Sequence, residues 1–130
     1  MCPKSQGKHG SGRGNIFSEQ CPSRKILDIL ANKWSLLVIH ALEEGNVRNG
    51  QLMRKVEGIS QKMLTQTLRE LEELNLVQRH EFEIVPPHVE YRLTKLGKGL
   101  LEHVIQLGNW IETQTQQCMK EKEKEKSLSN

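Results

Sequence analysis

The stretch Gly58–Leu76, which reads GISQKMLTQTLRELEELNL, has the pattern of one amphipathic helix that follows a turn. A helix turns 100° per residue, so Leu64, Leu68 and Leu71 fall on one narrow stripe and predict the face that packs. The opposite face is polar from its first turn onward, and its amide, hydroxyl and cationic groups could donate to bases and phosphates in a major groove. Because any surface helix has a polar face, the flanking segments must decide whether this one reads DNA.

The segments on both sides predict a winged helix-turn-helix. Residues 50–56, GQLMRKV, place apolar side chains on one face of a short helix, and Glu57-Gly58 and Ser60 suit a helix stop and a new N-cap. Downstream, residues 77–84 and 89–93 indicate two strands joined by a loop with two prolines. In this layout the second helix enters the major groove and the hairpin forms a two-stranded wing. The predicted fold class is α+β, mostly helical.

The residues also resemble a known family. The run ISQKMLTQTLRELEELNLVQR, followed by PPHVEYRLTKLGKGL, is similar to the HxlR-type winged-helix regulators of bacteria and archaea. Cys21-Pro22 before a first helix, and NKWSLL from Asn32 at the start of a second, resemble that family's CP and GKW-x-x-LI segments. The resemblance runs from about Cys21 to Ile111 and implies a homodimeric transcriptional regulator.

Docking as in this family predicts which side chains meet double-stranded DNA. Amide and hydroxyl groups are expected nearest the bases and the two cations on phosphates, and the wing would add one histidine. This histidine stands where the family usually has Arg or Lys. Because an unperturbed imidazole is mostly uncharged at neutral pH, we expect a weaker positive charge at this position than in the family. The predicted contacts are Ser60, Gln61, Lys62, Thr65, Gln66, Arg69 and His88.

The terminal helices are expected to form a dimer interface. Pro22 suits the first position of one helix, and Thr94 suits the N-cap of the last. The apolar surface of the last helix is longer than a core of this size can cover, unless that helix is simply shorter. A two-fold dimer would cover it and set two reading helices about 34 Å apart. The predicted interface residues are Ile26, Leu100, Val104, Leu107 and Ile111, with Gly97, Gly99 and Gly108 permitting close approach.

Composition sets the expected domain boundaries and location. We expect a flexible N-terminal arm over residues 1–20, the DNA-binding and dimerisation domain over residues 21–117, and a charged, disordered tail over residues 118–130. With 35% hydrophobic residues and a net charge of +3, DNA binding must come from local placement of Lys and Arg. The sequence contains no apolar run of membrane-spanning length and no secretory segment, so we expect a cytoplasmic protein with no membrane partner.

Cys21 is the candidate for sensing an oxidant or another small-molecule signal. At the N-cap of the first helix, unpaired backbone N–H groups and the helix dipole would lower the pKa of its thiol. Several relatives use a cysteine in this region as a sensor, so the resemblance permits the role. The alternative is a small apolar residue before a helix, and Cys2 and Cys118 are either resolving partners or without a role.

Other functions find little support in the sequence. The cysteines and histidines lack metal-ligand spacing, and neither a phosphate-binding loop nor a nucleophile motif is present, so we predict no metal, no cofactor and no enzyme activity. The main rival is a winged-helix module for protein contact, since fold does not dictate function. The operator, the regulated genes, the sign of regulation and any inducer cannot be predicted from the sequence.

Overall fold

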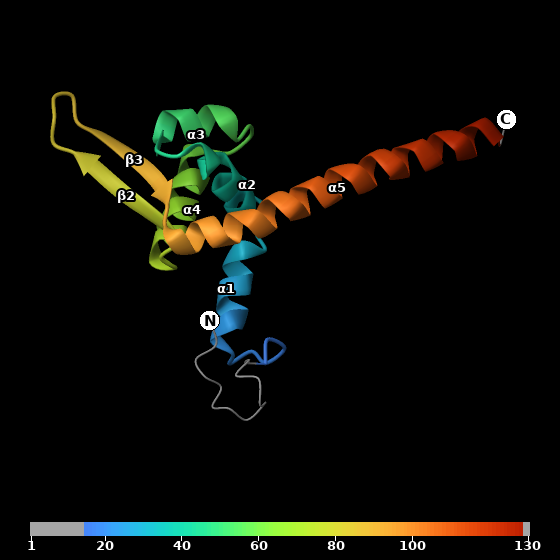
Figure 1. Cartoon of the computed structure of the whole chain (residues 1–130), viewed down its shortest axis with the longest axis horizontal. Coiled ribbons are helices and arrows are strands. Elements are labelled where there is room, and N and C mark those ends of the chain that lie inside the picture. Colours follow the sequence, from blue (N-terminus) through green and yellow to red (C-terminus); the bar gives the residue numbers. More distant parts are fainter. Residues whose placement is uncertain (1–14, 129–130) are drawn as a thin grey trace.

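The computed structural model describes residues 15–128, so most of the predicted N-terminal arm lies outside the described residues. Its elements are ordered along the chain as α1 (Pro22–Leu30), α2 (Lys33–Ala41), the 3-10 turn η1 (Leu42–Glu44), β1 (Val47–Arg48), α3 (Asn49–Lys55), α4 (Gln61–Glu73), β2 (Val77–Phe82), β3 (His88–Leu93) and α5 (Lys95–Leu128). Figure 1 shows α2, α3 and α4 gathered beside the β2–β3 hairpin, while α1 and α5 reach away from this body.

The helix-turn-helix predicted from the sequence is confirmed. Gly58 adopts φ 89°, a left-handed conformation that glycine takes at little cost, and it turns the chain between α3 and α4. Ser60 is the N-cap of α4, and its Oγ accepts a hydrogen bond from the Met63 amide at 3.0 Å. On the packing side of α4, Leu64, Leu68 and Leu71 are all buried.

The wing is part of a three-stranded antiparallel sheet with the order β1-β3-β2. β2 pairs with β3 from Val77 opposite Leu93 to Phe82 opposite His88. The third strand, β1, was not predicted, because its two residues are too short to show an alternating pattern. The winged helix-turn-helix fold class is confirmed, and the two predicted wing strands gain a neighbour.

The core lies between α2, α4 and the sheet. Its fully buried side chains include Val38 and Ile39 of α2, which pack with Leu52 of α3 and the buried leucines of α4. Trp34 also packs against this cluster, as predicted from its place at the head of an apolar stripe. The core therefore fixes the packing side of α4 and leaves the other side outward.

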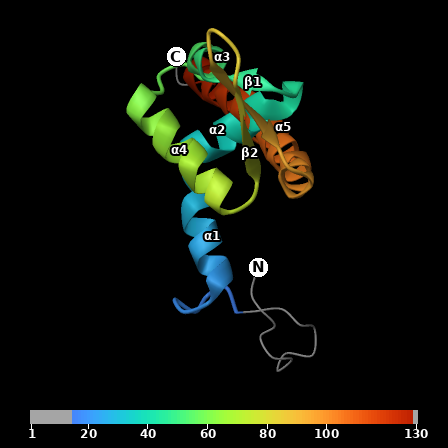
Figure 2. The ribbon, with the colours of Figure 1, turned by 90° about the vertical axis from the view of Figure 1, so that its left-hand side faces the viewer.

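α1 is the least buried helix of the body. It begins at Pro22 with Cys21 as N-cap, as predicted, but none of its own residues is fully buried. Leu27 is 46% exposed, and the helix hangs away from the body in Figures 1 and 2. An amphipathic helix that buries so little of its apolar face lacks a cover in the single chain.

α5 corrects the predicted C-terminal boundary. Thr94 is its N-cap, since the Thr94 hydroxyl accepts from the Gly97 amide at 3.0 Å, but the helix continues to Leu128 through the segment expected to be a disordered tail. That segment contains Lys, Glu and Met, which are strong helix formers, and opposite charges recur three residues apart from Lys120 to Lys126. No helix among the described residues is long and apolar enough to cross a membrane.

The glycines of α5 have different roles. A Cβ at Gly97 would lie 2.1 Å from the Leu76 carbonyl oxygen, so this glycine permits α5 to pass close to the end of α4 in its own chain. Its predicted role in a contact between two chains is therefore wrong. At Gly99 and Gly108 a Cβ would meet nothing within 4 Å, which leaves both positions open to a partner.

Gly97→Ala should lower the free energy of unfolding by about 1–3 kcal/mol, because the new methyl group would push backbone against backbone. Gly99→Ala is the matched control on the same helix, and it should stabilise the protein by up to about 1 kcal/mol because alanine favours helix. Urea unfolding of both variants measures the two changes. Equal effects of the two substitutions would contradict this account of Gly97.

Candidate nucleic-acid interface

The outward face of α4 carries all the DNA contacts predicted for the reading helix. The structure places them on two and a half turns of one helix, and every one of them is exposed: Ser60, Gln61, Lys62, Thr65, Gln66 and Arg69. The leucine stripe on the opposite side is buried, so these side chains cannot turn inward without unpacking α4. The arrangement leaves a polar surface free for a flat or grooved partner.

Hydrogen bonds within α4 organise this face. Gln61 Nε2 donates to Thr65 Oγ1 at 3.1 Å, and Gln66 Nε2 donates to Glu70 Oε1 at 2.7 Å. These contacts join residues four apart on an exposed surface and are easily exchanged for a ligand. Within the part of the chain that the structure describes, Lys62 and Arg69 take part in no ion pair.

The N-terminal end of α4 lies away from α1. Figure 2 shows α4 running from the α3 turn toward α1, so that its C-terminal end lies near α1 and its first turn lies far from it. Leu74, just after α4, indeed lines a cavity together with Ile26 and Leu30 of α1. The first turn also carries the positive end of the helix dipole, which favours phosphate.

His88 is held more tightly than the sequence suggested. Its ring stacks on Phe82 with centroids 4.4 Å apart, and its Nε2 lies 3.2 Å from Glu90 Oε2. Its side chain is only 19% exposed, and Glu90 also pairs with Arg48 at 4.0 Å. A phosphate contact by His88 would therefore have to compete with Glu90.

The sheet presents cations that sequence reasoning missed. Arg48 of β1, Arg79 of β2 and Arg92 of β3 are all exposed. A hydrogen bond with Tyr91 and the ion pair with Glu81 raise the pKa of Arg79, so it stays charged. Alternation along β3 would have placed Arg92 on the outward face, opposite Gln78, whereas Arg79 lies opposite Tyr91 on the face that buries Val77 and Leu93. Arg48 lies on a strand too short to predict.

The loop of the wing is apolar and acidic rather than basic. Val85 is 97% exposed and Ile84 53% exposed, and Glu83 precedes them. Cationic contact at the wing must therefore come from the strands and not from residues 83–87.

Cys21 lies where the sequence placed it, with one difference. It is the N-cap of α1, it is 8% exposed, and it is disulfide-bonded. A disulfide sulfur has no acidic proton, so the expected lowering of the thiol pKa applies only to the reduced protein. Cys118 has an exposed free thiol, and Cys2 lies outside the described residues.

The predicted dimer residues divide into three groups. Ile26 and Leu100 line a cavity of about 540 Å³ between α1, the end of α4 and α5. Leu107 and Ile111 line a second one of about 210 Å³ between α2 and α5. Val104 lines the second cavity too, but it is only 6% exposed and packs into the core of its own chain.

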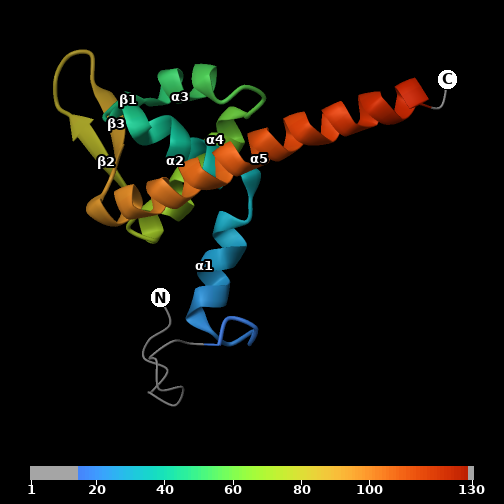
Figure 3. The same ribbon diagram turned by 45° about the vertical axis from the view of Figure 1, so that its right-hand side comes forward.

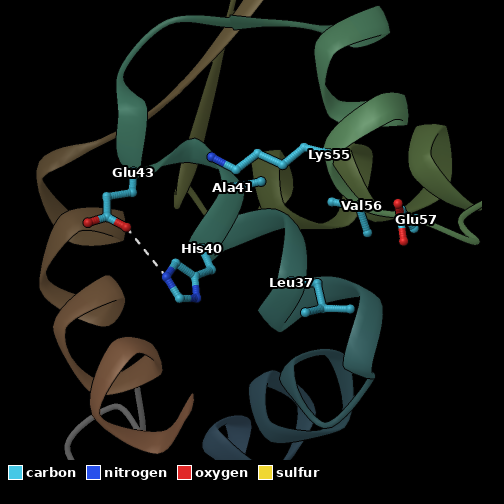
Figure 4. Close-up of a pocket in the computed structure, with 7 residues that line it drawn as sticks. All are labelled: Leu37, His40, Ala41, Glu43, Lys55, Val56 and Glu57. Carbon is cyan, nitrogen blue, oxygen red and sulfur yellow. Dashed lines mark ion pairs between the residues drawn. The ribbon is translucent and has the colours of Figure 1, made fainter. Parts of the chain in front are cut away.

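A third cavity, of about 280 Å³, lies between α2 and the turn before α4. Figure 4 shows Leu37, Ala41 and Val56 around it and His40 pointing toward Glu43, with Nε2 and Oε2 3.4 Å apart. Lys55 at its rim also has a carboxylate partner, since it pairs with Glu44. Over residues 15–128, no three His, Cys, Asp or Glu side chains are grouped in a way that could hold a metal.

Comparisons with known proteins agree with this geometry. The sequence profile of the HxlR-like helix-turn-helix family matches residues 29–119. The chain is 48% identical over 99 residues to the uncharacterized HTH-type transcriptional regulator YtfH of Escherichia coli (strain K12). The aligned residues cover 76% of this chain and 79% of that protein.

Solved structures show the same relationship. The fold matches that of the candidate transcriptional regulator ytfH from Salmonella typhimurium with a TM-score of 0.77 and 42% identity, over 85% of this chain and 99% of that one. It also matches the redox regulator HypR in its oxidized form, with a TM-score of 0.66 and 38% identity, over 72% of this chain and 96% of that one. With its buried α4 leucines, outward polar face and three-stranded wing sheet, this chain belongs to the HxlR-like helix-turn-helix family of transcriptional regulators.

Proposed function

We propose that this DNA-binding transcriptional regulator binds a pseudo-palindromic operator as a homodimer, with α4 of each copy in a major groove. The observation that carries the proposal is the exposed hydrogen-bonding and cationic face of α4 above a buried leucine stripe. A regulator that binds DNA works in the compartment that holds the chromosome, which is the cytoplasmic location expected from the sequence.

The side chains of α4 fall into two proposed roles. Gln61, Thr65 and Gln66 are the base readers, because an amide can donate and accept at an adenine edge and a hydroxyl can do either. Lys62, Arg69 and the N-cap Ser60 position the helix on phosphates, which gives affinity without base specificity. On the wing, we keep His88 as a contact that forms when its imidazole leaves Glu90.

The homodimer is supported by apolar surface that one chain leaves uncovered. α1 buries none of its residues completely, and the two cavities beside α5 are lined mostly by leucine and isoleucine. Apolar openings of this extent on a small domain usually mark an interaction site. A second copy would cover Ile26, Leu100, Leu107 and Ile111, and two-fold symmetry would explain a palindromic site.

Control by oxidation is the proposed regulation. Cys21 is the N-cap of α1, so the state of its sulfur changes the entry into a helix that we place in the dimer interface. In the reduced protein, peroxide would take two electrons and two protons from two thiols, which form a disulfide as two waters are released. Relatives described as redox regulators share this fold.

The alternative of a winged-helix module for protein contact fits the surface less well. Such a module has no need for two unpaired cations among amides and hydroxyls, whereas a DNA groove does. The family consists of regulators and not of enzymes, and we propose no catalytic activity for this chain.

Lys62→Ala should weaken binding to a duplex selected from a random pool, and it should reduce the slope of log affinity against log salt by roughly one unit per half-site. Lys25→Ala is the matched control, because Lys25 is an exposed lysine on α1, far from the first turn of α4. A salt titration of both variants measures the slopes. An unchanged slope for Lys62→Ala would remove this residue from the phosphate contacts, and no binding by the parent even at low salt would favour the protein-contact alternative.

Operator binding should change when the reduced protein is treated with peroxide or a quinone, and Cys21→Ser should abolish this response. Gel-shift titrations of parent and variant, each with and without oxidant, compare the four states. Cys118→Ser is the control for oxidation at the exposed free thiol, and it should respond as the parent does. The same affinity in all four states would contradict sensing by Cys21.

A further inference from the structure

The end of α4 is hydrogen-bonded to the start of α5 through Thr94. α4 closes with Asn75 in a left-handed conformation, φ 61°, and the Leu76 amide then donates to the Leu71 carbonyl oxygen at 3.0 Å. This arrangement is a Schellman motif, which turns the chain sharply after a helix. The two carbonyl oxygens that follow the helix, those of Asn75 and Leu76, both accept hydrogen bonds from Thr94.

Thr94 contacts both helices at once. Its amide donates to the Leu76 carbonyl oxygen at 3.0 Å, and its hydroxyl donates to the Asn75 carbonyl oxygen at 2.7 Å. The same hydroxyl oxygen accepts from the Gly97 amide at 3.0 Å in the first turn of α5. A Cβ at Gly97 would clash with the Leu76 carbonyl, so the two backbones are in contact. These residues form the α4–α5 junction: Asn75, Leu76, Thr94 and Gly97.

The junction holds the first turn of α5, and the core holds the helix further along. Figures 1 and 3 show α5 starting beside the C-terminal end of α4 and then running past α2. Val104, about 10 Å along α5 from Gly97, packs into the core next to α2. Between these two attachments, the cavity of about 540 Å³ separates α5 from Leu74 at the end of α4. Loss of the junction would therefore leave α5 free to swivel about its contact with α2.

We propose that the α4–α5 junction sets the spacing between half-sites that the protein accepts, with Thr94 as a positioning residue for DNA recognition. This proposal rests on the homodimer and the operator proposed above. In a dimer held through α5, the angle between α5 and the body determines how far apart the two reading helices lie.

The geometry makes that spacing sensitive to small movements at the junction. The first turn of α4 lies about 20 Å along the helix from Asn75, so a swivel of about 10° moves this turn by about 3.5 Å. The shift is close to the rise of one base pair, about 3.4 Å. A junction that holds the angle therefore selects one spacing, whereas a loosened junction accepts its neighbours as well.

A spacing series tests the role of Thr94. The probes are a duplex that the parent selects from a random pool, the same duplex with one base pair inserted or removed at its centre, and a single half-site. The parent should lose at least about tenfold in affinity when the spacing changes, because the two reading helices can no longer bind together. Thr94→Val lacks the hydroxyl, so its loss should be at most about threefold, with half-site affinity unchanged.

Two further substitutions separate the junction from helix capping. Thr94→Ser keeps the hydroxyl and should keep the narrow spacing of the parent. Thr94→Asp keeps an acceptor for the Gly97 amide, so α5 remains capped, but a carboxylate has no proton to donate to Asn75. It should therefore accept altered spacings as Thr94→Val does. Thr113→Val is the matched control, because the Thr113 hydroxyl donates at 2.9 Å to the Asn109 carbonyl oxygen within α5 itself.

The outcomes separate this inference from the proposed function. A sharp spacing preference in the parent that both Thr94→Val and Thr94→Asp lose supports the junction. A parent without a preference, or two variants that keep it, would overturn the inference and leave the operator proposal intact. Loss in Thr94→Val alone would assign the effect to capping and would also overturn it. A parent that binds the half-site as tightly as the selected duplex would overturn both proposals. Thr94→Asp decides the case if Thr94→Val fails to fold.

Discussion

The packing of three leucines of α4 against the core determines what the rest of the molecule can do. Leu64, Leu68 and Leu71 are nearly inaccessible, and they meet the apolar side chains of α2 and the end of the sheet. Burying each leucine contributes about 1.5–3 kcal/mol, which is large beside the stability of a small domain. A rotation of α4 that hid its glutamines would expose these leucines, so the outward direction of the polar face is set by the core.

The sequence was sufficient for the parts of the fold whose periodicity is strong. The turn at Gly58, the N-caps Ser60 and Thr94 and the two wing strands all carry local signals, and the structure confirms them. β1 has only two residues and thus no period, so its pairing with β3 had to come from the structure. α5 is longer than predicted, because the Lys and Glu residues of its alternating-charge run favour helix even though they have no apolar face to bury.

The candidate site shows the same division between local and long-range information. Exposure along α4 follows from one helical pattern, and the predicted residues all lie on its surface. The stacking of His88 on Phe82 depends on the register between β2 and β3, which one sequence does not specify. The burial of Val104 and the close approach at Gly97 depend on how α5 crosses α2 and the end of α4, and no helical pattern contains that information.

The apolar surfaces of α1 and α5 connect DNA recognition with assembly. A single reading helix makes few contacts, whereas two helices fixed one turn of DNA apart bind one duplex together. In the homodimer proposed here, the interface that fixes their spacing includes α1, which begins after Cys21, and α5. Changes in the sulfur of Cys21 could therefore alter the spacing without touching α4.

Selection of binding sites from random duplexes tests the central claim most directly. If α4 reads the major groove in two copies related by a two-fold axis, the selected sites should be pseudo-palindromes whose half-sites are centred about 34–36 Å apart. Replacing Gln66 by Ala should then relax the preference at one base position in each half-site by about 1–3 kcal/mol. Selected sequences without symmetry, or an unchanged preference at every position in the variant, would contradict the account.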